Sequence, residues 1–229
     1  MNYQWLLFDA DNTLFDYDKA EATALANSFQ QFGLDFDQTT GAQYRTINAQ
    51  IWHDYELGHI TQQDLRAERF RRLFTAVHLP TDAEAFSRQY LVNLSQAGHL
   101  LEGVEALLRR LAASYHIAII TNGIADVQRP RLAASPIHDL VEAFVISEDV
   151  GVAKPDPAIF DVAFARMGQP AKSEVLIIGD SLSSDMQGGL NYGIDTCWYN
   201  PAGKTASLPV TYEIRQLDEL LSILTEREA

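Results

Sequence analysis

The chain is 229 residues long, which is enough for one large domain or two modest ones, each with a buried core. Hydrophobic residues make up 47% and charged residues 21% of it, which excludes disordered, collagen-like and fibrous proteins. The formal net charge of −14 would repel a nucleic-acid backbone, so we expect no nucleic-acid polymer as a partner. A small anionic substrate stays possible, because a local cation can override the overall charge.

Several features of the sequence predict a cytoplasmic protein without a membrane partner. No apolar run approaches the ~18–20 residues that a membrane span needs. The first apolar run stops at Asp9 and has no basic segment before it, which argues against a signal peptide. Cys197, the single cysteine, lies in an apolar run, so we expect a buried and inert thiol. A lone cysteine suits a reducing compartment.

Short apolar runs predict the buried strands of a parallel sheet. These runs cover residues 5–8, 116–120, 143–146, 175–178 and 194–198. Apolar residues at helical spacing predict helices over 104–111, 159–167 and, at the C-terminus, 214–224. Because strands alternate with helices, we predict an α/β fold, a doubly wound parallel sheet with right-handed crossovers.

Residues 16–98 differ from the rest of the chain, because they contain helical patterns and no strand signal. Thr61 and Asp64 form a capping-box pattern that opens one of about four expected helices. We therefore predict a helical cap domain at 16–98 inserted into an α/β core formed by 1–15 and 99–229. An insertion directly after the first strand lies near the sheet edge where such folds bind ligands, so we expect the cap domain to act as a lid.

Two carboxylates follow the first predicted strand. Asp9 and Asp11 are separated by one residue, and in an extended chain that spacing places both on the same side. Close carboxylates repel each other, so they indicate a divalent cation or a shared proton. The alternative is an ordinary strand-to-loop junction, in which Asp and Asn favour the turn.

Polar residues also follow other predicted strands. Thr121 and Asn122 offer a hydroxyl and main-chain N–H groups that suit a phosphate, or else a plain helix cap. Lys154 stands before prolines that would fix its direction, or else it is an exposed loop lysine. Asp180 and Asp185 follow the fourth strand, either as metal-site acids or as a cap and a surface acid.

The carboxyl ends of parallel strands share one edge of the sheet, so we expect all these groups to converge there. Several acids, one lysine, a threonine hydroxyl and main-chain amides fit Mg²⁺-assisted phosphoryl transfer through an aspartyl nucleophile. The sequence therefore predicts an enzyme that acts on a small phosphomonoester.

The ordered segments DADNT (9–13), ITNG (120–123), AKP (153–155) and GDSLSSD (179–185) resemble the four motifs of the haloacid dehalogenase-like hydrolases. The helical insertion is similar to that family's helical cap. The phrases FDADNTLF and VISEDVGVAKP look most like bacterial pyrimidine 5′-nucleotidases within the family. The resemblance therefore implies a 5′-nucleotidase that hydrolyses pyrimidine nucleoside monophosphates through an aspartyl-phosphate intermediate.

The resemblance also implies catalytic and phosphate-binding roles for individual residues. Asp9 would be the nucleophile, and Asp11 would protonate the leaving alkoxide and then activate water. Thr121 and the main chain of Asn122 would hold phosphate oxygens, and Lys154 would neutralise the developing charge.

The metal site is likewise implied by the resemblance. Asp9, Asp180 and the main-chain carbonyl of Asp11 would bind Mg²⁺, with Mn²⁺ as another suitable divalent ion. Asp185 would be a supporting acid near Lys154 and the water molecules of the metal.

Other functions are compatible with parts of this pattern. A haloacid dehalogenase needs the nucleophile alone, a sugar-phosphate mutase shares all four motifs, and a phosphatase for phosphoglycolate or sugar phosphates would differ in its cap. A non-catalytic binding module on the same fold is an alternative of another class. In the cap, Trp52 and Tyr55 lie three residues apart, so they share a helix face that either contacts the substrate or packs in the cap core.

Overall fold

The computed structural model describes residues 3–226 and divides into two compact units, each described here by itself. The first unit contains the sheet and comprises residues 3–16, 99–125 and 132–226. The second unit is helical and comprises residues 17–98 and 126–131. Within the described residues, no helix is both long enough and apolar enough to cross a membrane.

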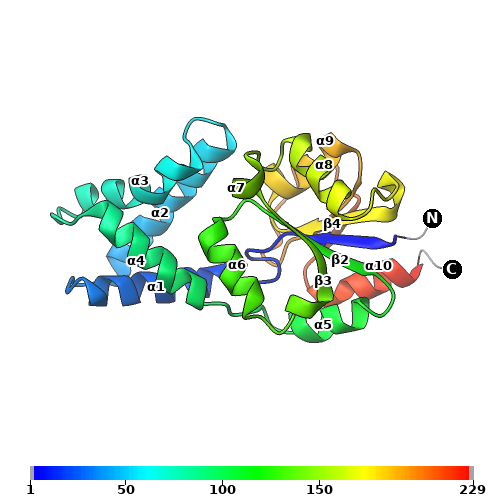
Figure 1. Cartoon of the computed structure of the whole chain (residues 1–229), viewed down its shortest axis with the longest axis horizontal. Coiled ribbons are helices and arrows are strands. Elements are labelled where there is room, and N and C mark those ends of the chain that lie inside the picture. The colour runs from blue at the N-terminus through cyan, green and yellow to red at the C-terminus, as the bar shows by residue number, and fades with distance from the viewer. Residues whose placement is uncertain (1–2, 227–229) are drawn as a thin grey trace. The chain divides into compact units, whose positions relative to one another are not determined.

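The first unit is built on a six-stranded sheet with the order β3-β2-β1-β4-β5-β6, in which every neighbouring pair is parallel (Figure 1). The strands are β1 (Trp5–Phe8), β2 (His116–Thr121), β3 (Val141–Ile146), β4 (Val175–Gly179), β5 (Asp195–Tyr199) and β6 (Tyr212–Ile214). In the register, Phe8 at the end of β1 pairs with Ile119 of β2 and Ile178 of β4. The predicted doubly wound parallel α/β fold is confirmed.

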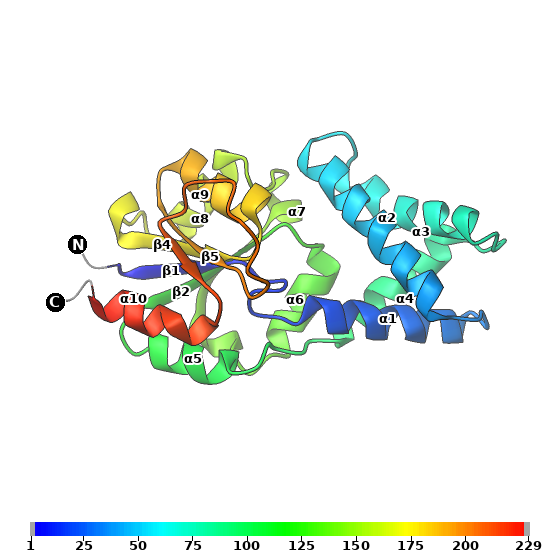
Figure 2. The ribbon, with the colours of Figure 1, turned by 180° about the vertical axis from the view of Figure 1, so that it is seen from behind.

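Helices cover both faces of this sheet, which is why the strands are apolar on both sides (Figure 2). Leu6 and Phe8 point to the face that packs with α5 (Val104–Leu111) and α10 (Leu220–Glu226). Leu7 points to the opposite face, which packs with α8 (Pro157–Arg166), and α9 (Gln187–Tyr192) follows β4 on that side. The remaining α-helices are α7 (Ser147–Val150) and α6 (Ala125–Ala133), of which the ends belong to this unit and residues 126–131 to the second.

The C-terminal region corrects one prediction. Ile214 was expected in a helix over 214–224, but it lies in β6, the edge strand beside β5. The helix begins later, with a 3₁₀ turn at Leu217–Glu219 that continues into α10. Ile214 and Leu217 are both buried, and their spacing therefore imitates the apolar stripe of a helix although the first residue is extended.

The second unit is a bundle of α1 (Tyr17–Gln31), α2 (Gln38–Glu56), α3 (Gln62–Ala76) and α4 (Ala83–Gln96), together with residues 126–131, the greater part of α6. Thr61 caps α3 by accepting a hydrogen bond from the Asp64 amide, as the capping-box pattern predicted. Aromatic side chains fill the bundle. The ring of Phe86 contacts the rings of Phe29 and Phe70, and all three side chains are buried. The unit therefore has an apolar core of its own.

The two ends of the insertion are held together within the first unit. The Asp16 amide donates to the His99 carbonyl at 2.9 Å, and Phe15 forms an antiparallel bridge with Leu100. The Leu101 amide donates to the carbonyl of Leu14, also at 2.9 Å. The chain therefore leaves the sheet unit and returns to it through a pair of hydrogen-bonded neighbouring segments.

Candidate active site

The loop after β1 presents Asp9 at the carboxyl edge of the sheet. The Asp9 amide donates to the Ile178 carbonyl at 2.8 Å, which continues the pairing of β1 with β4. Beyond it the chain turns tightly, because the amides of Leu14 and Phe15 both donate to the Ala10 carbonyl at 2.9 Å. Asn12 has a φ of 60°, a left-handed conformation that Asn tolerates better than most residues.

Lys154 is the buried cation of the site. Its ammonium lies 2.6 Å from Asp9 Oδ1, 2.6 Å from Asp185 Oδ1 and 2.8 Å from the Ile120 carbonyl. Its side chain is only 1% exposed, which rules out the alternative of an exposed loop lysine. Burial alone would lower the pKa of Lys154, but the charges of Asp185 and Asp9 outweigh it and raise that pKa above its usual value.

Three carboxylates meet around this lysine. Oxygen atoms of Asp9, Asp180 and Asp185 all lie within 4.8 Å of one another. Burial raises the pKa of Asp180 to about 7, and the charge of Asp185 adds to that rise. The pKa of Asp9 is also raised well above its usual value, mainly by burial, with Lys154 opposing and the other two acids adding to the shift.

The donor set of this cluster fits a divalent cation. Three carboxylates and one ammonium leave an excess of negative charge, and carboxylate oxygens are the ligands that Mg²⁺ prefers. The cluster contains Asp185, which was expected only as a supporting acid. Asp11 was expected to contribute its main-chain carbonyl. Among the described residues its carboxylate is not part of the cluster, and its negative charge adds to the rise in the pKa of Asp180. The arrangement can hold a hard cation beside the Asp9 carboxylate.

Gly179 makes room for Asp185. A Cβ atom at Gly179 would overlap the Asp185 carboxylate, so a side chain there is incompatible with the observed arrangement. The second oxygen of Asp185 accepts a hydrogen bond from the Ser181 amide at 3.0 Å. The close approach that this glycine permits is therefore used by the Asp185 carboxylate.

The residues at the end of β2 lie at the same sheet edge, and some of their polar groups are already hydrogen-bonded within the protein. Thr121 is buried, and its Oγ1 accepts a hydrogen bond from the Gly123 amide at 3.0 Å, which leaves its hydroxyl proton able to donate. The Asn122 side chain bonds to the main chain of Lys154. The first amide of α6, at Ala125, donates to Glu148 at 2.7 Å. The Ala125 amide is therefore already hydrogen-bonded to a carboxylate of the protein.

Some residues that shape the site were not identified from the sequence. Trp198, at the end of β5, donates its indole N–H to the Asp180 carbonyl at 2.9 Å. The Ile120 carbonyl holds the ammonium of Lys154, and Glu148 holds the start of α6. Trp198 and Ile120 are indistinguishable from core residues in the sequence, because their roles depend on a polar atom of the main chain or on a single indole N–H.

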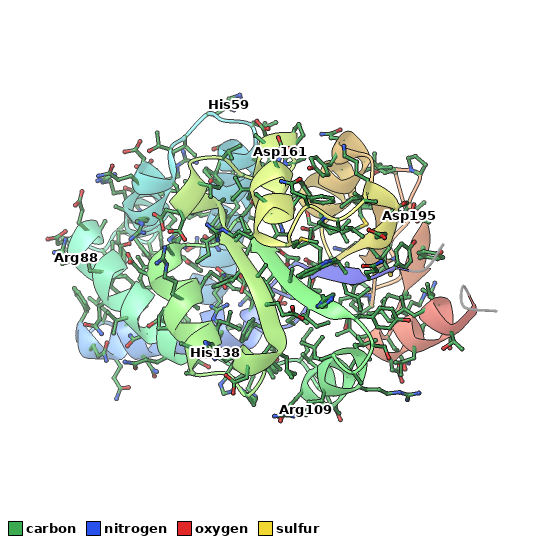
Figure 3. The ribbon with its side chains drawn as sticks, turned by 45° about the vertical axis from the view of Figure 1, so that its right-hand side comes forward. His59, Arg88, Arg109, His138, Asp161 and Asp195 are labelled. Atoms are coloured by element: carbon green, nitrogen blue, oxygen red, sulfur yellow. The ribbon has the colours of Figure 1, made fainter. Side chains whose placement is uncertain are left out.

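Trp52 and Tyr55 belong to the helical unit and are described within it. Trp52 and Tyr55 are both partly exposed on α2 and make an edge-to-face contact, with ring centroids 5.8 Å apart. Neither is among the buried residues of the helical bundle. His59 and His138 are both exposed, and His59 projects from the loop between α2 and α3 (Figure 3). Cys197 is buried as predicted, and burial raises the pKa of its thiol to about 12.

Comparison with known proteins identifies the family. A family model described as haloacid dehalogenase-like hydrolase matches residues 6–199. The chain therefore belongs to the haloacid dehalogenase-like hydrolase family, and the prediction of an enzyme of this family is confirmed.

Individual relatives cover nearly the whole chain. The pyrimidine 5′-nucleotidase YjjG of Escherichia coli is 34% identical over 226 residues, covering 98% of this chain and 99% of that protein. The pyrimidine 5′-nucleotidase PynA of Streptococcus pneumoniae is 37% identical over 228 residues, covering 98% and 96%. A crystal structure of the HAD-hydrolase YfnB from Bacillus subtilis bound to magnesium has a TM-score of 0.93 and 36% identity, covering 98% of this chain and all of that one.

Proposed function

We propose that this enzyme is a Mg²⁺-dependent phosphatase that hydrolyses pyrimidine nucleoside 5′-monophosphates and their deoxy forms. The observation that carries the chemistry is the Asp9 carboxylate, held 2.6 Å from the Lys154 ammonium within a cluster of acids. The names of YjjG and PynA support the substrate class, because both relatives match along almost their full length.

The reaction begins with attack by Asp9. A carboxylate oxygen of Asp9 forms a bond to phosphorus while the bond from phosphorus to the ester oxygen breaks. Asp11 donates a proton to the leaving alkoxide, which departs as a nucleoside. Lys154 stabilises the negative charge of the transferring group, and Thr121 with the Asn122 main chain holds its oxygens.

The second step releases phosphate and restores the enzyme. Asp11, now ionised, takes a proton from water as that water attacks the phosphorus of the aspartyl phosphate. The bond between Asp9 and phosphorus breaks, and inorganic phosphate leaves. Asp9 and Asp180 would hold Mg²⁺ together with the Asp11 carbonyl, and Asp185 would support them. The bound ion supplies positive charge that offsets the repulsion between the carboxylates and a phosphate dianion.

The helical unit is the part of the chain that we expect to select the leaving group. The groups at the sheet edge recognise a phosphate and a cation, which all phosphomonoesters share, so discrimination has to come from other residues. We assign this role to residues 16–98 as a cap domain, with the partly exposed pair Trp52 and Tyr55 stacking on a flat base. A small phosphomonoester is thus the expected partner, and the net charge of −14 disfavours a nucleic-acid polymer. The lone, buried cysteine suits a cytoplasmic location.

A phosphate-release screen tests this proposal. Purified enzyme is given UMP, dUMP, dTMP, purine monophosphates, phosphoglycolate and sugar phosphates, each with Mg²⁺, with Mn²⁺ and with EDTA. We expect pyrimidine nucleotides to give the highest kcat/KM and EDTA to abolish turnover. If a sugar phosphate or phosphoglycolate leads, the nucleotidase assignment is overturned while the phosphatase chemistry stands. If no phosphate is released from any compound, the phosphatase assignment is overturned as well.

A further inference from the structure

The side chain of Asn122 is engaged with the main chain of Lys154. Asn122 Oδ1 accepts a hydrogen bond from the Lys154 amide at 2.8 Å, and Asn122 Nδ2 donates to the Lys154 carbonyl at 2.8 Å. One side-chain amide therefore satisfies both polar main-chain atoms of a residue 32 positions away in the sequence. This pairing resembles the exchange of two hydrogen bonds between residues of neighbouring strands.

The same strand end holds Lys154 at two points. Asn122, directly after β2, holds its main chain, and the Ile120 carbonyl within β2 accepts a hydrogen bond from its ammonium at 2.8 Å. Between these points the lysine side chain has several rotatable bonds, which would otherwise allow many positions for the ammonium. With both ends held, the ammonium lies 2.6 Å from Asp9 and 2.6 Å from Asp185.

We propose that Asn122 is a positioning residue, whose side chain fixes the main chain of Lys154 so that its ammonium meets Asp9 and the transferring phosphoryl group. The role of the Asn122 side chain is thus distinct from a contact between its main chain and phosphate. The effect on catalysis rests on the proposed phosphatase function, but the effect on Lys154 itself can be measured without any substrate.

A neighbouring asparagine provides a matched control. Asn191 Nδ2 donates to the carbonyl of Pro155 at 3.1 Å, one residue beyond Lys154, and Asn191 is exposed. Asn191→Ala removes an amide hydrogen bond to the same loop without touching either polar atom of the Lys154 main chain. We expect this variant to behave like the unaltered enzyme.

The first test measures the accessibility of Lys154 by acylation and mass spectrometry, in the substrate-free protein. Lys19, Lys172 and Lys204 serve as internal references for the reagent. We expect Asn122→Ala and Asn122→Asp to increase the labelling of Lys154 relative to these lysines, by tenfold or so, and Asn191→Ala to leave it unchanged. Asn122→Asp keeps an acceptor for the Lys154 amide but places a second oxygen against the Lys154 carbonyl. Unchanged labelling in both Asn122 variants, with melting temperatures equal to that of the unaltered enzyme, would overturn the proposal.

The second test is a double-mutant cycle on turnover of p-nitrophenyl phosphate, whose activated leaving group keeps weak variants measurable. A misplacement of a reactive group by about 1 Å can cost ~10²-fold in rate, so we expect Asn122→Ala to lower kcat by roughly 10- to 100-fold. In a Lys154→Met background, the same change should cost less than about twofold, because its effect passes through the lysine. An equal loss in both backgrounds would show that Asn122 acts on phosphate or on stability independently of Lys154.

The two tests separate the proposal from the function on which it rests. If labelling changes as expected but no phosphatase activity exists, the proposed function fails and the control of Lys154 by Asn122 stands. If activity exists but labelling and the cycle show no coupling, Asn122 is not a positioning residue and the proposed function stands.

Discussion

The Asp185 carboxylate lies directly over Gly179, where the Cβ atom of any other residue would be. This relationship connects the end of β4 to the buried lysine, because Asp185 also contacts the Lys154 ammonium at 2.6 Å. The glycine therefore determines where the acid lies, and through the acid it affects the charge balance around Lys154.

Gly179→Ala tests this relationship. We expect the added methyl group to displace Asp185, to lower the free energy of unfolding by about 1–3 kcal/mol as overpacking does, and to reduce kcat strongly. Thermal unfolding and phosphate release measure the two effects. Ser183→Ala, at an exposed position in the loop after β4, is the control and should change neither. An alanine variant with unaltered stability and activity would contradict the overlap.

Asp9→Asn tests the nucleophile. The amide is almost the same size as the carboxylate but is a much weaker nucleophile, so we expect turnover to fall by more than about 10⁴-fold while the protein stays folded. Phosphate release and circular dichroism measure the result, and beryllofluoride, a mimic of the phosphoryl group, should inhibit the unaltered enzyme. Asp139→Asn, at a side chain that is 96% exposed, is the matched control. Substantial Mg²⁺-dependent turnover by Asp9→Asn would rule out an aspartyl phosphate.

Asp11→Asn tests the general acid and base. Loss of proton transfer costs about 10²–10⁴-fold in rate, and we expect that cost in phosphoenzyme formation from a nucleotide. With p-nitrophenyl phosphate the loss in this first step should be much smaller, because p-nitrophenolate leaves without a proton. Single-turnover measurements on both substrates give the comparison. Equal losses would mean that Asp11 does not protonate the leaving group.

Magnesium should stabilise the folded protein through the acid cluster. A ligand at 100 times its Kd adds about 2.7 kcal/mol to the free energy of unfolding when it binds only the folded state. We therefore expect Mg²⁺ to raise the melting temperature and EDTA to reverse that rise. Asp180→Asn removes one of three clustered carboxylates, so the rise should shrink or vanish in this variant. A rise of the same size at the same Mg²⁺ concentrations would place the ion elsewhere.

Trp52→Ala and Tyr55→Ala test recognition by the helical unit. Stacking on a base is worth about 1–3 kcal/mol, so each change should lower kcat/KM for UMP by roughly 5- to 150-fold. Turnover of p-nitrophenyl phosphate should fall much less, because it lacks a nucleobase. Equal losses on both substrates, together with a lower melting temperature, would instead assign these aromatic residues to packing.

Much of the sheet was predictable from the sequence, because parallel strands that are buried on both faces appear as continuous apolar runs. The edge strand β6 was not, since it has only three residues and Ile214 matches the helical spacing of the residues after it. The convergence of Asp9, Lys154, Asp180 and Asp185 was also predictable, because the carboxyl ends of parallel strands lie at the same edge of the sheet. Their roles in catalysis stay predictions that the variants above will test.

The contacts that fix these groups were not predictable. The Asn122 side chain bonds to main-chain atoms of Lys154, and the Trp198 indole bonds to the main-chain carbonyl of Asp180. Main-chain atoms are the same in every residue, so sequence patterns do not indicate which of them receives a side chain. The packing of Asp185 over Gly179 likewise depends on the path of the loop after β4, which includes a π-helical turn at Leu182–Met186.

The paired ends of the insertion have a consequence for the engineering of this chain. Because the Asp16 amide bonds to the His99 carbonyl, the sheet unit presents two adjacent attachment points that are already joined without help from the 82 residues 17–98. Residues 17–98 can therefore be replaced by a helical segment of different length or sequence, while the sheet and the loops that follow its strands stay unchanged. Replacement of residues 17–98 by a short glycine-rich link should therefore leave the fold of the sheet unit in place, and chimaeras with other helical segments would show whether substrate choice follows the insertion.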